Sequence, residues 1–109
     1  LILLGMGPDG HTASLFPGTD AVREQTRLVV APWVEQFQTY RLTMTPPVLC
    51  NAAHVVFDAG GADKAEAMQQ VLHGKYQPDV YPSQIVTPTH GRLLWLVDEA
   101  AARLLPSPR

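Results

Sequence analysis

Residues 1–18 read LILLGMGPDGHTASLFPG, which predicts a buried strand followed by a glycine-rich loop. Residues 1–4 are all apolar and Gly5 interrupts them at once, as at the carboxyl end of a strand that is buried on both faces. Ligands of open α/β sheets bind at this end of the strands, so residues 5–11 are the first candidate for a site. Because a chain seldom begins in mid-strand, we also expect further residues before Leu1.

The loop matches the dinucleotide-binding pattern G-x-G-x-x-G at Gly5, Gly7 and Gly10. That pattern needs a full helix after the third glycine, with its N-terminus facing the pyrophosphate, whereas Pro17 stops any helix after about two turns. It also needs an acidic residue at the end of the next strand, and the strand predicted over residues 27–31 contains none. We therefore expect neither a nicotinamide nor a flavin, and no other cofactor.

Asp9 and His11 carry the chemistry that this loop offers. Histidine takes up and returns protons near neutral pH, so His11 is a candidate general base. Asp9, two residues earlier, is placed to orient the imidazole or to hold the imidazolium that forms. Ser14 lies outside a G-x-S-x-G elbow, so we reject it as a nucleophile. The alternative is a plain glycine turn in which Asp9 bonds its own backbone.

The remaining segments alternate between strand and helix patterns. Residues 40–45 predict a half-buried strand, with Leu42 and Met44 on its apolar face and Arg41 and the threonines on its polar face. Further strands are expected over residues 27–31, 54–59 and 93–97, a short helix or turn over 11–16, and helices over 46–53, 62–73 and 99–105. This alternation indicates an α/β fold with a mostly parallel sheet.

Length and charge narrow the function classes. The 109 residues suffice for a single domain, and the net charge of -2 provides no basic field for nucleic acid or anionic lipid. Cys50 stands alone, so no internal disulfide forms. No apolar run reaches the ~18 residues of a membrane span, and no signal peptide is visible. We expect a cytoplasmic protein with no nucleic-acid or membrane partner, and the sequence leaves its oligomeric state open.

Two cations are candidates for binding an anion. Arg41 lies on the polar face of its predicted strand, where a guanidinium binds phosphate bidentately, and Lys64 begins a helix whose backbone N–H groups also favour an anion. The alternative for each is a solvated surface charge. The four histidines show no metal-ligand spacing, so no metal is expected. We expect the large aromatic residues to be core, not a stacking platform: Trp33, Phe37, Phe57 and Trp95.

Residues 5–18, GMGPDGHTASLFPG, resemble the signature of the 6-phosphogluconolactonase family. Residues 41–45 with 47–49 are similar to its second motif, Gly61 with Lys64 to its third, and residues 95–102 to its C-terminal strand and helix. The related glucosamine-6-phosphate deaminases share the Gly-Asp-Gly-His core but continue with an Asn-Glu-Pro run. The chain departs from the family pattern at Cys50, where asparagine is frequent and here comes one place later, and at Asp58, where an apolar residue is usual.

The resemblance implies a three-layer α/β fold, Rossmann-like and of the sugar-phosphate isomerase/deaminase type. Residues 1–109 would be one partial domain, the C-terminal half of a longer one. The implied activity is hydrolysis of a sugar-phosphate lactone, 6-phospho-D-glucono-1,5-lactone, to 6-phosphogluconate in the pentose phosphate pathway. Its implied catalytic residues are His11 and Asp9. Its implied substrate-binding residues are Gly7, Gly10, Thr12, Arg41 and Lys64.

Two rival interpretations remain open at this point. The same fold could serve a deaminase or isomerase acting on another sugar phosphate, although residues 12–17 favour the lactonase. Alternatively, the chain could be a catalytically incomplete fragment that binds a sugar phosphate weakly.

Overall fold

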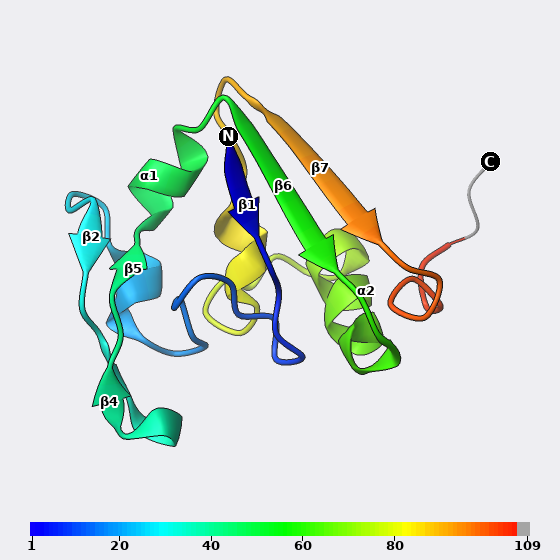
Figure 1. Ribbon diagram of the computed structural model, residues 1–109, viewed down its shortest axis with the longest axis horizontal. Coiled ribbons are helices and arrows are strands. Elements are labelled where there is room, and N and C mark those ends of the chain that lie inside the picture. The colour runs from blue at the N-terminus through cyan, green and yellow to red at the C-terminus, as the bar shows by residue number, and fades with distance from the viewer. Residues whose placement is uncertain (107–109) are drawn as a thin grey trace.

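The computed structural model describes residues 1–106, which fold around a three-stranded parallel sheet in the order β1-β6-β7 (Figure 1). These strands are β1 (Ile2–Leu4), β6 (His54–Ala59) and β7 (Arg92–Val97). In the central strand β6, Phe57 pairs with Leu4 of β1 and with Trp95 of β7. The α/β class and the parallel sheet are thus confirmed, and each strand lies within one residue of its predicted range.

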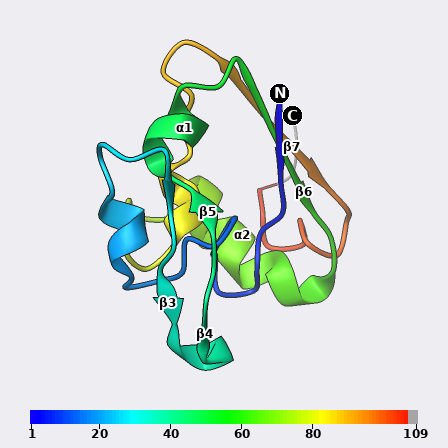
Figure 2. The ribbon, with the colours of Figure 1, turned by 60° about the vertical axis from the view of Figure 1, so that its left-hand side comes forward.

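Two α-helices, α1 (Pro46–Cys50) and α2 (Ala65–His73), lie on the same side of this sheet (Figures 1 and 2). The 3-10 turn η3 (Ala62–Lys64) leads directly into α2, so the two together fill the helix predicted over 62–73. Two further 3-10 turns, η1 (Asp20–Arg23) and η4 (Pro82–Ile85), pack around this core. The most deeply buried apolar side chains include Leu15, Leu49, Val55, Phe57, Met68 and Val86.

The opposite face of the sheet is open in the described residues. On β6 the side chains at 55, 57 and 59 are buried, whereas Asp58 is exposed. Leu3, Leu94 and Leu96 are 71%, 54% and 52% exposed on the flanking strands, which is unusual for leucine in a parallel sheet. Residues 1–106 therefore supply the sheet and one helical layer of the expected three-layer fold.

A separate antiparallel ribbon stands beside this sheet. Its strand β2 (Val29–Val30) pairs with β5 (Thr43–Met44). Its strand β3 (Trp33–Val34) pairs with β4 (Thr39–Tyr40), and the turn η2 (Glu35–Phe37) connects β3 to β4. The strands predicted over 27–31 and 40–45 therefore form a hairpin and do not join the parallel sheet. The physical reason is the short connection, because parallel strands need a crossover of a dozen or more residues.

The predicted faces of residues 40–45 are wrong. Leu42 and Met44 are 78% and 38% exposed, whereas Thr43 and Thr45 are buried. Their hydroxyls are satisfied: Thr43 Oγ1 donates to the Met44 carbonyl at 2.8 Å and accepts from the Ser14 N–H at 3.1 Å, and Thr45 Oγ1 donates to the Arg27 carbonyl. Because these hydrogen bonds replace those that the hydroxyls would make with water, burying the two threonines costs little free energy.

The helix predicted over 99–105 is also wrong, because the chain forms turns there. The Ala102 N–H bonds the Asp98 carbonyl and the Leu105 N–H bonds the Ala102 carbonyl, so no continuous helical ladder develops. Seven residues followed by Pro106 are too few to sustain a helix without strong packing. None of the helices in residues 1–106 is long and apolar enough to cross a membrane.

Candidate active site

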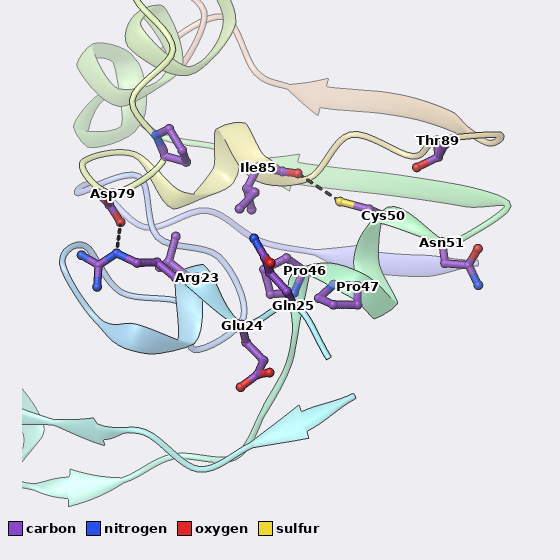
Figure 3. Close-up of a pocket in the computed structure, with 12 residues that line it drawn as sticks. Arg23, Glu24, Gln25, Pro46, Pro47, Cys50, Asn51, Asp79, Ile85 and Thr89 are labelled. Atoms are coloured by element: carbon purple, nitrogen blue, oxygen red, sulfur yellow. Dashed lines mark hydrogen bonds and ion pairs between the residues drawn. The ribbon is translucent and has the colours of Figure 1, made fainter. Parts of the chain in front are cut away.

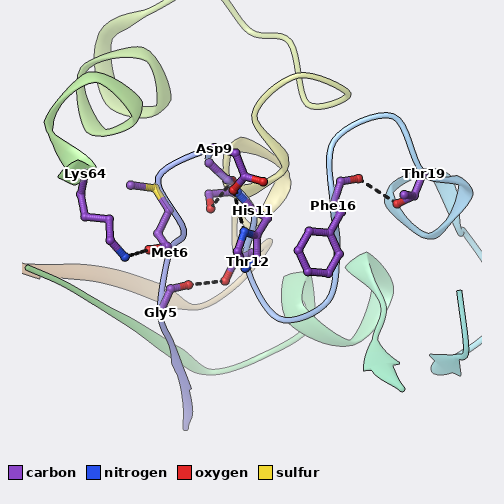
Figure 4. A network of polar contacts seen from close by, with 10 residues as sticks. Gly5, Met6, Asp9, His11, Thr12, Phe16, Thr19 and Lys64 are labelled. Atoms are coloured by element: carbon purple, nitrogen blue, oxygen red, sulfur yellow. Dashed lines mark hydrogen bonds and ion pairs between the residues drawn. The ribbon is translucent and has the colours of Figure 1, made fainter. Parts of the chain in front are cut away.

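The loop after β1 closes on itself through backbone hydrogen bonds. The Gly10 N–H donates to the Gly7 carbonyl and the Gly7 N–H donates to the His11 carbonyl, each at 2.9 Å. Thr12 Oγ1 donates to the Gly5 carbonyl at 2.7 Å and ties the far side of the loop to the end of the strand (Figure 4). The chain therefore presents residues 7–11 as one compact unit at the carboxyl edge of the sheet.

Asp9 and His11 form a pair within this unit. His11 Nδ1 lies 2.6 Å from Asp9 Oδ1, and the same oxygen accepts the His11 backbone N–H at 3.1 Å (Figure 4). The two side chains are 26% and 40% exposed for His11 and Asp9, so the pair remains accessible to a ligand. The Asp9 carboxylate therefore holds the His11 imidazole, and the alternative that Asp9 bonds only its own turn is wrong.

The protonation of this pair follows from its geometry. Partial burial of Asp9 would raise its pKa, but the hydrogen bonds from the His11 side chain and backbone together lower it below the ordinary value. Asp9 is therefore a carboxylate at neutral pH, and a carboxylate can only accept. His11 Nδ1 must then carry the proton, which leaves the lone pair on Nε2 as the base.

Glycine at positions 7 and 10 makes room for this arrangement. A Cβ on Gly7 would lie 2.2 Å from both Cε1 and Nδ1 of His11 and 2.9 Å from Asp9 Oδ1. Gly10 has a φ of 85°, in the left-handed region, and a Cβ there would meet the Tyr81 ring at 2.8 Å. Its carbonyl also accepts hydrogen bonds from both the N–H and the hydroxyl of Ser83, in η4.

Gly7→Ala is expected to lower the turnover of the lactone that the family resemblance implies by about 10²-fold, because the added methyl displaces the imidazole from Asp9. The measurement is kcat at a temperature at which circular dichroism shows the variant folded. Gly5→Ala is the matched control, since its Cβ would meet nothing closer than the Asp58 carbonyl at 3.9 Å. Equal losses in the two variants would contradict a specific contact between residue 7 and His11.

Lys64 reaches the same loop from the end of β6. Its Nζ donates to the Met6 carbonyl at 2.5 Å, which leaves two of the three ammonium N–H donors for a ligand (Figure 4). The Gly60–Gly61 turn that precedes it is tied to β7, because the Gly61 N–H donates to the Asp98 carboxylate at 3.1 and 3.0 Å. The ends of all three parallel strands are thereby linked.

A cavity of about 520 Å³ lies where these elements meet. Its lining includes Gly7, His11 and Lys64, so the structure brings three of the predicted site residues together. His11 and Lys64 alone contribute titratable side chains to the lining that the described residues provide. A cavity with one base and one cation at the carboxyl edge of a parallel sheet is equipped for proton transfer on an anionic substrate.

The other predicted residues lie outside the lining. Neither Asp9 nor Gly10 lines the cavity, and Thr12 is 1% exposed with its hydroxyl bonded to Gly5, so Thr12 shapes the loop. Arg41 is exposed on the turn between β4 and β5, and its guanidinium carbon lies 4.5 Å from the centre of the Phe37 ring. Substrate contacts for Thr12 and Arg41 stay predictions.

Sequence reasoning missed two features of the site. Phe16 stacks on the His11 ring, with centroids 4.3 Å apart and planes 28° apart. Asp98, directly after β7, holds the turn before Lys64 through the Gly61 N–H. Its signal in the sequence is the first acid after the last strand, but only the strand order shows that it is a neighbour of the Gly60–Gly61 pair.

Asp98→Asn is expected to lower the melting temperature at neutral pH, because the charged acceptor for two N–H groups is lost. Hydrogen bonds from Ala101 and then Gly61 lower the pKa of Asp98, so its stabilisation is complete above the ordinary value of 3.8 and disappears as pH falls through the lower folded-state value. The difference in melting temperature between the two proteins should therefore close well below pH 3.8. Thermal unfolding followed by circular dichroism across pH checks this, with Asp58→Asn as a surface-carboxylate control.

A larger hollow of about 740 Å³ lies between η1, α1 and the segment around Asp79 (Figure 3). Arg23 Nε bonds Asp79 Oδ1 at 3.2 Å on its wall, and Cys50 and Asn51 also line it. Neither His11 nor Lys64 contributes to it. We assign the candidate active site to the smaller cavity, because that cavity contains the paired base and the cation.

Comparisons with known proteins agree on one family. The family of glucosamine-6-phosphate isomerases/6-phosphogluconolactonase matches residues 1–95. The 6-phosphogluconolactonase of Rattus norvegicus is 44% identical, over 99% of this chain and 42% of the rat protein. The crystal structure of 6-phosphogluconolactonase from Leishmania guyanensis superposes with a TM-score of 0.83 at 30% identity, over 96% of this chain and 41% of that one.

A monomeric glucosamine-6-phosphate deaminase superposes less closely, with a TM-score of 0.73 at 28% identity, over 94% of this chain and 46% of that one. The chain thus spans about two fifths of the length of the curated relatives it matches.

Proposed function

Because the chain belongs to the family of glucosamine-6-phosphate isomerases and 6-phosphogluconolactonases, we propose that it hydrolyses 6-phospho-D-glucono-1,5-lactone to 6-phosphogluconate in the oxidative pentose phosphate pathway. The observation that carries this proposal is the Asp9–His11 pair at the cavity shared with Lys64. Residues 12–17, Thr-Ala-Ser-Leu-Phe-Pro, favour the lactonase over the deaminase, whose motif continues with Asn-Glu-Pro. Both curated relatives and solved structures named as lactonases support the same choice.

The chemistry assigned to His11 is general base and then general acid catalysis. Nε2 takes a proton from water as the water oxygen bonds to the lactone carbonyl carbon, which gives an oxyanion. The ring carbon–oxygen bond then breaks, and the imidazolium returns the proton to the departing ring oxygen. Asp9 stabilises the imidazolium through Nδ1, and a base positioned in this way contributes about 10²–10⁴-fold to the rate.

Lys64 is the proposed phosphate ligand. Its ammonium is already oriented by the Met6 carbonyl, so binding an anion requires little further ordering of the side chain. It is also the last residue of the turn η3, which leads into helix α2, and backbone N–H groups at the start of a helix favour negative charge. Arg41 is a second predicted ligand by family resemblance, from the hairpin outside the cavity.

Hydrolysis of freshly prepared 6-phosphogluconolactone tests the proposal. The assay is run below neutral pH, because the lactone hydrolyses spontaneously and faster in base. Protein-dependent turnover of the lactone, with no ammonia released from glucosamine 6-phosphate, is the expected result. Ammonia release without lactone turnover would favour the deaminase, and turnover of neither substrate would mean that these 109 residues form an incomplete site.

A further inference from the structure

Four side chains connect the catalytic pair to the antiparallel ribbon. The His11 ring stacks on Phe16, the Phe16 ring meets Phe37 edge-on with centroids 5.8 Å apart and planes at 65°, and the Arg41 guanidinium lies 4.5 Å above Phe37. We call the His11, Phe16, Phe37 and Arg41 side chains the aromatic column. It joins the loop after β1 to the η2 turn and the β4–β5 connection.

Phe16 is the fixed member of this column. Its side chain is 5% exposed, and its carbonyl accepts hydrogen bonds from the Thr19 N–H at 3.2 Å and from the Thr19 hydroxyl at 2.8 Å (Figure 4). By contrast, Phe37 is 47% exposed, so it braces the outer side of the column and not the core. Rigid support of this kind is what a catalytic side chain needs, because an error of about 1 Å in its placement can cost about 10²-fold in rate.

The hydrogen bond to Asp9 does not by itself fix the imidazole plane. A single hydrogen bond to Nδ1 tolerates a range of angles, so it leaves the side-chain torsions of His11 some freedom to tilt the ring. Contact with the flat face of Phe16 removes this freedom, while the close approach of Gly7 restricts the ring from another direction.

We propose that Phe16 is a positioning residue that sets the plane of the His11 imidazole, and that Phe37 with Arg41 braces Phe16 from the hairpin. The consequence for catalysis rests on the proposed function, whereas the position of the ring does not. Arg41 then acts on the base through two aromatic rings, in addition to any contact with substrate.

The test combines NMR of the His11 ring with kinetics on the 109-residue chain. Phe16→Leu keeps apolar bulk but removes the aromatic face. Loss of its ring current should move the His11 ring-proton resonances downfield. It should also lower kcat about 10- to 100-fold with little change in KM. Phe16→Tyr retains a ring and should stay near wild type in both measurements. Phe37→Leu should change both in the same direction by less, and Tyr40→Leu is the control, because Tyr40 is 68% exposed on the same hairpin but outside the column.

Unchanged His11 resonances in a folded Phe16→Leu chain would overturn the proposal, as would equal effects of leucine and tyrosine at this position. If Phe16→Leu does not fold, Phe37→Leu tests the proposal in its place. His11 resonances that are the same in Phe37→Leu and in Tyr40→Leu would then refute the role of Phe37 as a brace. If wild type hydrolyses no lactone, the proposed function fails while the resonances still test the positioning.

Discussion

Replacing His11 by alanine is expected to slow lactone hydrolysis by about 10²–10⁴-fold, the range that a positioned general base contributes. The effect should be the largest of any single substitution on activity. His11 and Lys64 are the titratable residues lining the cavity in the described residues, and an ammonium already held by the Met6 carbonyl cannot serve as the base in its place. Because the proposed mechanism has the imidazole act on water and not on the phosphate, KM should change much less than kcat.

The measurement is kcat and KM with fresh lactone below neutral pH, after subtraction of spontaneous hydrolysis. His54→Ala is the matched control, because it removes an exposed imidazole at the start of β6, the end of the sheet opposite the cavity. His54→Ala should retain wild-type turnover. If His11→Ala kept more than about a tenth of wild-type kcat, a base other than His11 would have to be sought, because a positioned base is worth more than that.

Local sequence was enough to find the pair formed by Asp9 and His11. Asp9 and His11 are two residues apart, and the glycines around them predict a tight loop at the end of a strand. The three parallel strands were predicted to within one residue, because each is an apolar or β-branched run that ends at a glycine or an acid. Information of this kind lies within a few residues of the feature that it predicts.

The aromatic column could not be predicted in the same way. Phe16 and Phe37 are 21 positions apart (37 − 16), and they meet only because residues 29–44 fold back as a hairpin that the sequence reading did not recognise. Trp33 and Phe37 were expected in the core, because no basic residues interleave the aromatic ones as they would in a stacking platform. Both are more than 40% exposed, so that prediction is wrong, whereas Phe57 is buried as expected. Trp33 instead packs edge-on against Tyr40 and donates to Glu35 on the ribbon surface.

The inverted faces of residues 40–45 have a related cause. Alternation shows that a strand has two faces, but it does not show which face meets the core. Threonine is small and β-branched, and Thr43 and Thr45 donate their hydroxyls to backbone carbonyls, so their burial leaves no hydroxyl unpaired. Leu42 and Met44 are left on the exposed side. Hydrogen bonding of the polar residues, which sequence alone does not reveal, decided the orientation.

The largest expected effect on stability is that of Phe57→Ala, at about 3–5 kcal/mol. Phe57 is fully buried at the centre of the sheet, paired with Leu4 on one side and Trp95 on the other. Its ring also stacks face to face on Trp95, with centroids 3.9 Å apart and planes 4° apart, so the substitution removes a ring–ring contact as well as apolar burial. The free energy of unfolding of a single domain is only about 5–15 kcal/mol, so the substitution would remove a large part of it.

Urea unfolding followed by circular dichroism measures this loss, and Tyr76→Ala is its matched control, since Tyr76 is 65% exposed in a loop. The control should lie within about 0.5 kcal/mol of wild type, as for surface substitutions generally. The slope of unfolding free energy against urea should stay the same in both variants, because the surface exposed on unfolding hardly changes. A cost below about 1 kcal/mol for Phe57→Ala would contradict a close-packed site. It would mean that the helices do not cover this face of the sheet closely, and the loops at its carboxyl edge, which carry His11 and Lys64, would then lack the rigid support that their proposed chemistry requires.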